Sequence, residues 1–241
     1  MPIGIIVNTL SIFFGGLIGA FAGNKLSEEF KDKLNMIFGC CAMGMGISTI
    51  VLMKNMPAVI FAIIAGTSIG ICIHLGDKIN HAAMGMQKVI AKIVKADSSA
   101  DESYTTALVT CIVLFCASGT GIYGSIVSGM TGDHSILIAK SILDLFTALI
   151  FACVLGAVVC AVAVPQFIIF ILLFLLAGII YPLTNEIMIA DFKACGGFLL
   201  LATGFRMIKV KMFPVADMIP SMIIVMPLSY VWVSCILPFV S

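Results

Sequence analysis

Long hydrophobic runs separated by short polar stretches fill the chain from one end to the other. As a helix, about 20 apolar residues cross a hydrocarbon core of about 30 Å, and each run is close to that length. Because hydrocarbon offers no partners to backbone amides, such runs must be helical. The pattern predicts an all-α, polytopic membrane protein of about eight transmembrane helices, at residues 3–22, 34–53, 57–75, 105–128, 135–161, 165–181, 188–208 and 218–238.

The connections between these runs differ in length and character. Two are very short, around Lys54–Met56 and at Val164, and each predicts an antiparallel hairpin. The longest, residues 76–104, repeats apolar residues every three to four positions with lysines between them, and includes the polar linker Asp97–Glu102. We expect a cytoplasmic loop with an amphipathic interfacial helix on the inner leaflet, its lysines towards anionic headgroups, as an anchor or as a regulatory gate.

Basic residues are distributed unevenly between the two predicted faces. One face carries ten of the 13 Lys and Arg residues: Lys25, Lys31, Lys33, Lys78, Lys88, Lys92, Lys95, Arg206, Lys209 and Lys211. The other face has only Lys54 and Lys193, with Asp191 nearby to guard an entrance or to reach the headgroups. Since cytoplasmic loops carry the excess of Lys and Arg, we expect a bacterial inner-membrane protein with both termini extracytoplasmic.

Composition supports a membrane protein and excludes other classes. Of 241 residues, 61% are hydrophobic and 10% are charged, whereas soluble domains carry about 25% charged residues. We therefore expect residues 1–241 to form a single transmembrane domain in contact with the lipid bilayer. The net charge of +1 gives no reason to expect nucleic acid as a partner. The nine cysteines lie in apolar runs without a Cys-x-x-Cys pair, so neither a zinc site nor a redox cofactor is expected.

The run 135–161 carries two charged residues within the membrane. Lys140 and Asp144 lie one helical turn apart, and Asp144 is expected about 15 Å deep, near the bilayer midplane. A charge there costs roughly 2.5–3.5 kcal/mol on insertion scales and usually serves function. We expect Asp144 to bind a cation or proton, Lys140 to tune its charge and Ser141 to add an oxygen ligand. The alternative is an ion pair that only stabilises the bundle.

The preceding run contains a stretch rich in glycine and small polar residues, from Ser118 to Gly132. Its low helix propensity favours a helix that breaks inside the membrane and exposes backbone ligands. Small residues every four positions favour close helix packing instead, and both interpretations can hold at once. The candidate ligands are Ser118, Gly119, Thr120, Ser125 and Asp133, together with Asn8 of the first run, whose alternative role is to hydrogen-bond a neighbouring helix.

Two further patterns concern the architecture. The first three spans overlay the last three at a constant offset of 158 residues, which pairs Asn8 with Gln166, Glu28 with Glu186, Gly39 with Gly197 and Gly46 with Gly204. Because matched helices run in opposite directions, a 3+2+3 inverted repeat is predicted; chance similarity among glycine-rich helices is the alternative. Small-residue seams at Gly15, Gly19 and Gly23, and at Gly66 and Gly70, predict packing within the bundle or in a homodimer.

At these residues the chain resembles a known family of bacterial inner-membrane proteins, catalogued as domain of unknown function 554. The likeness covers essentially the whole chain and rests on Gly4-x-x-x-Asn8 with Gly15, Gly16 and Gly19, on Phe115–Ile126 with Gly129 and Gly132-Asp133, on Lys140–Asp144, and on Gly196-Gly197 with Val215–Pro220. The chain departs from the pattern at Ser118 and Leu145, where glycine is usual, at Asp191, where glutamate is usual, and at Ser128, where an acid or amide is common. Ser128 argues against a second carboxylate in the run 105–128. The resemblance brings no assigned activity.

These observations predict a secondary transporter or permease for a small solute or monovalent ion, with its site between the first, fourth and fifth spans. A passive ion channel is the nearest alternative, and saturable, gradient-driven uptake separates the two. A membrane scaffold or sensor subunit is a third, and it would have a dry, packed centre with Asp144 fully paired. No HExxH, GxSxG or P-loop motif occurs, so no enzyme is predicted.

Overall fold

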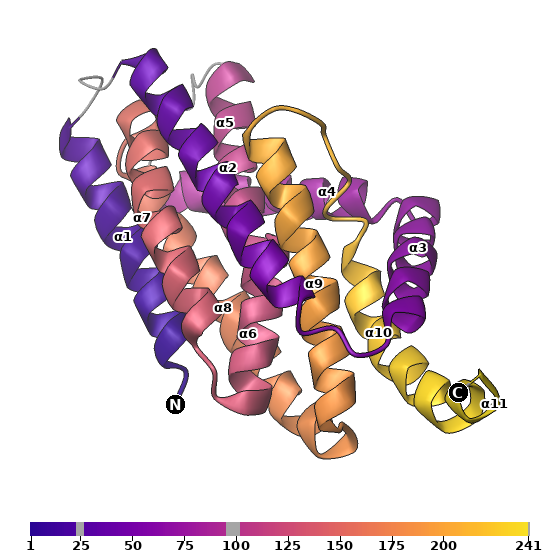
Figure 1. Cartoon of the computed structure of the whole chain (residues 1–241). Coiled ribbons are helices and arrows are strands. Elements are labelled where there is room, and N and C mark those ends of the chain that lie inside the picture. Colours follow the sequence, from indigo (N-terminus) through magenta and orange to yellow (C-terminus); the bar gives the residue numbers. More distant parts are fainter. Residues whose placement is uncertain (23–26, 95–101, 241) are drawn as a thin grey trace. The chain divides into compact units, whose positions relative to one another are not determined.

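The computed structural model describes residues 1–22, 27–94 and 102–240, and these ranges contain helices and no strands. Lys25, Lys95 and most of the linker Asp97–Glu102 lie outside the described residues. In chain order (Figure 1) the elements are α1 (Ile3–Ala22), α2 (Glu28–Ile50), α3 (Met56–Cys72), α4 (Leu75–Val94), α5 (Glu102–Cys116), α6 (Gly119–Thr131), α7 (Ser135–Leu155), α8 (Val158–Ile180), the 3₁₀ turn Tyr181–Leu183, α9 (Glu186–Met207), α10 (Ile219–Val231), the π-helical turn Trp232–Ile236 and α11 (Leu237–Val240).

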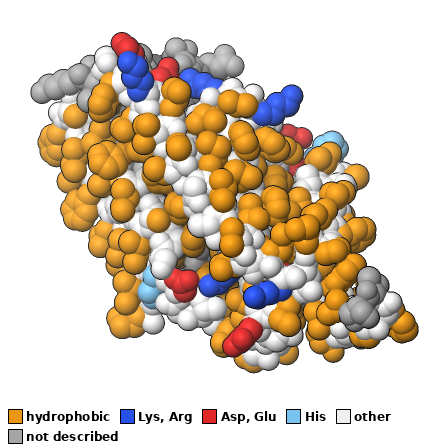
Figure 2. All heavy atoms as spheres, in the orientation of Figure 1, with side chains coloured by type: hydrophobic (Ala, Val, Ile, Leu, Met, Phe, Trp, Pro, Cys, Tyr) orange, Lys and Arg blue, Asp and Glu red, His pale blue; other side chains and the backbone are white. Residues whose placement is uncertain are grey.

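Most of these helices are long and apolar enough to cross a membrane. Among the described residues seven spans meet that test, and α3 with the following Leu75–Ala91 makes an eighth candidate. Figure 2 shows that hydrophobic side chains dominate the face in view, with few charged side chains among them. Large exposed residues such as Phe14, Phe61 and Leu175 would be unfavourable in water and suit contact with lipid tails. The protein is therefore a polytopic α-helical membrane protein.

The chain forms two compact units, each assembled from segments distant in the sequence. Unit 1 contains Met1–Asn35 and Asp77–Ala177, and so includes α1, most of α4, α5 to α7 and most of α8. Unit 2 contains Met36–Gly76 and Gly178–Ser241, and so includes most of α2, α3, α9 and α10.

In unit 1 α1 packs against α7 over much of its length, and the two helices lie side by side (Figure 1). A Cβ atom added at Gly15 or Gly19 would collide with the backbone carbonyl of Leu145 or Leu149, respectively. Glycine is required there because only a residue without a side chain lets two backbones approach so closely. The predicted seam thus packs within the chain at Gly15 and Gly19, and Gly23 lies outside the described residues.

In unit 2 the contact between α2 and α9 is reciprocal. A Cβ atom added at Gly46 would lie 2.7 Å from the carbonyl oxygen of Gly197, and one added at Gly197 would lie 2.7 Å from that of Gly46. Gly39 and Gly204 approach each other in the same way, at 2.9 and 2.6 Å. Because the residue numbers rise on one helix as they fall on the other, α2 and α9 are antiparallel. The second predicted seam, at Gly66 and Gly70, packs against the segment 217–221 of the same unit.

The hairpin expected at Val164 is wrongly placed. The connection between α7 and α8 lies at Gly156–Ala157, where Gly156 has φ 73°. Val164 and the adjacent Pro165 both lie inside α8. Membrane helices tolerate proline because neighbouring groups satisfy the backbone carbonyl that it frees. Gly156 ends α7 with φ 73° and ψ −158°, a conformation that is nearly restricted to glycine.

The amphipathic helix expected in the loop 76–104 is present as α4. Its Ala83 and Ile90 are buried in a cluster with Leu108 and Val159 of the same unit, whereas Val89 is exposed. Part of the apolar stripe that we expected to face the inner leaflet therefore packs against protein. Contact between the α4 lysines and headgroups remains a prediction.

The α2–α9 contact yields a first test. We expect Gly46→Leu to lower the free energy of unfolding by about 1–3 kcal/mol, because a side chain there forces two packed backbones apart. Gly44→Leu on the same helix is the matched control, since no atom lies within 4 Å of a Cβ atom built there. Thermal melting and equilibrium unfolding in detergent micelles measure both. Equal stability of the two variants would contradict the packing.

Candidate functional site

The helix α7 carries a buried ion pair near its middle. Asp144 is the tenth residue of the 21-residue helix, and Lys140, one turn earlier, lies on the same face. The Lys140 ammonium nitrogen lies 2.8 Å from Oδ1 and 2.6 Å from Oδ2 of Asp144. Lys140 is 4% exposed and Asp144 is 6% exposed. Each charge is thus neutralised by its neighbour, as a charge excluded from water requires.

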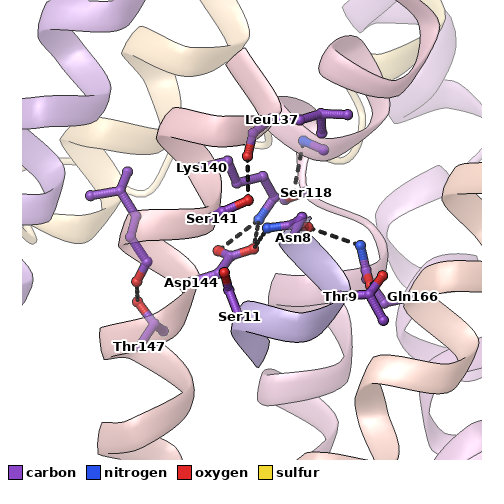
Figure 3. Close-up of polar contacts among 12 residues, drawn as sticks. Asn8, Thr9, Ser11, Ser118, Leu137, Lys140, Ser141, Asp144, Thr147 and Gln166 are labelled. Atoms are coloured by element: carbon purple, nitrogen blue, oxygen red, sulfur yellow. Dashed lines mark hydrogen bonds and ion pairs between the residues drawn. The ribbon is translucent and has the colours of Figure 1, made fainter. Parts of the chain in front are cut away.

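The first helix supplies the next partner of the carboxylate. Asn8 is fully buried, and its side-chain amide donates to Asp144 Oδ2 over 2.7 Å (Figure 3). The two residues are 136 positions apart in the sequence. The close approach of α1 to α7 at Gly15 and Gly19 is what allows this short side chain to reach the carboxylate.

A hydrogen-bonded chain continues from Asn8 to the eighth helix. Gln166 Nε2 donates to Asn8 Oδ1 over 2.9 Å, and Thr9 Oγ1 donates to Gln166 Oε1 over 2.9 Å (Figure 3). Because an ionised carboxylate only accepts, Asn8 must present its NH₂ group to Asp144, and its oxygen is then left for Gln166. The charge on Asp144 therefore fixes the orientation of both amides.

The span before α7 is broken, and its small residues also pack closely. α5 ends at Cys116 and α6 begins at Gly119; between them Ser118 caps α6, its hydroxyl accepting from Gly121 N over 3.2 Å. On α6, Gly121 packs against the Phe170 ring. The helix is thus interrupted at two residues and its small residues pack closely, while exposure of backbone ligands at the interruption remains a prediction. The Phe115 ring, just before the break, has its centroid 6.0 Å from the Lys140 nitrogen, so α5 ends beside the ion pair.

The structure joins only some of the predicted site residues. Asn8 and Lys140 each donate hydrogen bonds to the Asp144 carboxylate. Ser125 and Ser141 are buried but donate within their own helices, to the carbonyls of Gly121 and Leu137 at 2.7 and 2.6 Å.

The remaining predicted residues lie along the two central spans. Asp133, in the α6–α7 connection, accepts from Ser135 N over 3.0 Å in a turn that leads into α7. Gly119 and Thr120 form the buried first turn of α6. Within the described part of the chain, no group of three or more His, Cys, Asp or Glu side chains is placed to hold a metal ion.

Sequence analysis missed Gln166 as a site residue. It is fully buried. Two signals could have found it: it is a single amide in an otherwise apolar run, and the predicted repeat pairs it with Asn8.

Asp191 is fully buried, so its side chain does not reach the headgroups, which was one of the two roles expected for it. Its carboxylate accepts from the backbone nitrogens of Lys54 and Asn55 at 2.8 and 2.9 Å. It also accepts from the Asn55 amide at 2.8 Å and from the Ser229 hydroxyl at 2.6 Å. None of these four donor groups carries a charge, and three of them belong to Lys54 and Asn55, just before α3. Asp191 thus stabilises the N-terminus of α3, where a negative charge is favoured.

Comparison with known proteins agrees with this architecture. The family described as "Protein of unknown function (DUF554)" matches residues 3–230. The chain belongs to this family. It is 45% identical to the uncharacterized protein YqgA of Escherichia coli (strain K12) over 232 residues, which cover 96% of this chain and 98% of the relative. It is 27% identical to the uncharacterized membrane protein YdfK of Bacillus subtilis (strain 168) over 221 residues, covering 92% and 93%. No solved structure matches the chain.

The ion pair of this DUF554 protein yields a second test. Lys140→Met or Asp144→Asn alone leaves one buried charge unpaired, and each is expected to lower the free energy of unfolding by about 3–5 kcal/mol. The double variant Lys140→Met/Asp144→Asn removes both charges and should lose far less than the sum. Equilibrium unfolding in mixed micelles measures this cycle.

The matched control is an exposed Lys–carboxylate pair at the same spacing. Lys33 lies 2.7 Å from Glu29 on α2, with side chains 72% and 76% exposed. Lys33→Gln should therefore change stability by less than about 1 kcal/mol. Additive losses at Lys140 and Asp144 would mean that the two charges do not depend on each other.

A third test concerns Asp191. We expect Asp191→Asn to lower the free energy of unfolding by about 1.5–3 kcal/mol, because hydrogen bonds to a charged acceptor are replaced by bonds to a neutral one. Ser229→Ala removes one of the four donors and should cost about 1 kcal/mol. If Asp191→Asn is as stable as wild type, the carboxylate does not support α3 as described.

Proposed function

We propose that this protein is a secondary transporter or permease for a small solute or ion, with its site at Asn8, Lys140 and Asp144. The observation that carries the proposal is the buried ion pair in the middle of α7. Two charges at that depth cost free energy to insert, and apolar residues of similar size would often be at least as stable there. Their presence in the middle of a span is typical of residues that handle a substrate or an ion.

The broken span beside the pair supports the same function. Transporters often bind their ligands where a membrane helix is interrupted, since the helix ends offer unpaired backbone groups and partial charges. In this chain the interruption at Ala117–Ser118 follows Phe115, which lies beside Lys140.

Helix bounds and contacts also support an inverted repeat. At the offset of 158 residues, α2 (Glu28–Ile50) corresponds to 186–208, and α9 spans Glu186–Met207. The contact of Gly39 with Gly204 then corresponds to that of Gly197 with Gly46, and both contacts occur. The matched residues Asn8 and Gln166 are bonded to each other. Inverted repeats in transporters place the substrate site near the midplane, at the interface of the repeats.

We place the protein in a bacterial inner membrane, with the lysine-rich face cytoplasmic and both termini outside. The proposal assigns it no catalytic activity. The seams at Gly15 and Gly66 were one reason to expect a homodimer. Both pack within the chain, so they do not support one.

One observation favours a second candidate, a membrane scaffold or sensor subunit. Asp144 accepts three hydrogen bonds from Lys140 and Asn8, and the Asn8 oxygen in turn accepts one from Gln166. A closed polar centre of this kind is what a protein without a transport path would have.

The experiment begins with the melting temperature of the purified protein across Na⁺, K⁺, pH and a panel of small metabolites. A ligand of the folded state raises that temperature by mass action. Any ligand found is then tested for flux into proteoliposomes, which should be saturable, driven by its gradient and lost in Lys140→Met/Asp144→Asn. Flux that does not saturate indicates a channel. A flat panel without flux, with Asp144→Asn merely less stable, indicates a scaffold.

A further inference from the structure

The site carries one positive and one negative charge, and this restricts the ligands that it accepts. With Lys140 and Asp144 in contact, the net charge at the middle of α7 is zero. A monovalent cation bound there would leave one excess positive charge, and a simple carboxylate would leave one excess negative charge. Each excess charge costs roughly 2.5–3.5 kcal/mol near the midplane. A ligand of zero net charge avoids this cost.

An uncharged polar solute would find few free hydrogen-bonding groups at the pair. Asn8 uses its amide on Asp144 and its oxygen on Gln166, and the oxygen of Gln166 accepts from Thr9. Ser141 donates to its own helix. A ligand can instead replace the contact between Lys140 and Asp144, because each of these charges can bind an opposite charge on the ligand.

We infer that the site takes a small zwitterion with a carboxylate and an ammonium group a few atoms apart, as in an α-amino acid. The ligand carboxylate binds the Lys140 ammonium, and the ligand ammonium binds the Asp144 carboxylate. Two ion pairs replace one, and the net charge stays zero. This substrate class rests on the proposed transport function and makes it specific.

The two partners differ in a way that lets the pair open. Asp144 is held by Asn8 as well as by Lys140, so its carboxylate stays in place when the lysine moves. The Lys140 ammonium group lies at the end of a flexible four-carbon chain, so it can move away from Asp144 without a change in the backbone. Its nitrogen lies beside Phe115, near the end of α5 and the break before α6.

The test compares whole zwitterions with their halves. At constant ionic strength, the purified protein is melted with glycine, alanine or leucine, with acetate or methylammonium, and with sodium or potassium chloride. We expect at least one amino acid to raise the melting temperature saturably, by about 5 °C at a hundredfold excess over its Kd. Acetate and methylammonium each lack one charge and should leave it unchanged.

Variants place the response at the ion pair. Lys140→Met/Asp144→Asn has no charges to exchange and should lose the shift, and its neutral pair guards against failure to fold. Lys33→Gln breaks the exposed pair with Glu29 and should keep the full shift. A shift that survives in the double variant, a response to acetate or methylammonium alone, or a flat response to every amino acid would each overturn the inference.

Failure of the inference and failure of the proposed function give different results. If a metal cation or an uncharged solute binds and moves while no amino acid does, the substrate class is wrong and transport stands. If an amino acid binds at the pair but does not cross proteoliposomes, the substrate class stands and transport is wrong.

Discussion

The contact between α1 and α7 decides where the buried polar groups of unit 1 meet. Gly15 and Gly19 let the backbones of α1 and α7 touch. At this short distance between the helices, the side-chain amide of Asn8 lies 2.7 Å from the Asp144 carboxylate. Helices held one methyl group further apart would leave a buried carboxylate short of a donor and a buried amide without a partner. Since unsatisfied groups in the membrane cost several kcal/mol each, the glycines and the polar chain depend on each other.

The two buried carboxylates satisfy the same requirement in different ways. Asp191 is held by two backbone amides and two neutral side chains around the start of α3. Releasing it would free backbone groups at a helix terminus. Asp144 is held mainly by a lysine side chain, which can move by rotating its own bonds. For this reason we place the exchangeable site at Asp144 and a structural role at Asp191, although Asp191 is the more deeply buried.

The sequence predicted the helices well because length and hydropathy are properties of continuous segments. The pairing of Lys140 with Asp144 was also predictable, since a spacing of four residues on a helix is local geometry. The partner of Asn8 was not, because it depends on which helices pack and at what height. Gln166 was left out of the site, and the burial of Asp191 was not foreseen, for the same reason. The connection at Gly156 was misplaced because apolar residues continue on both sides of it, so hydropathy does not mark the end of α7.

Full pairing of Asp144 does not by itself distinguish a transporter from a scaffold. A transporter without its substrate must also avoid leaving a single charge near the midplane, so a closed ion pair is the expected resting arrangement in both cases. A transporter and a scaffold differ in whether Lys140 and Asp144, once separated, have other binding partners that give a similar free energy. A ligand that carries both charges supplies such partners, and it opens the pair only as far as its differential affinity allows. The chemistry of the ligand, rather than the burial of Asp144, therefore separates the two functions.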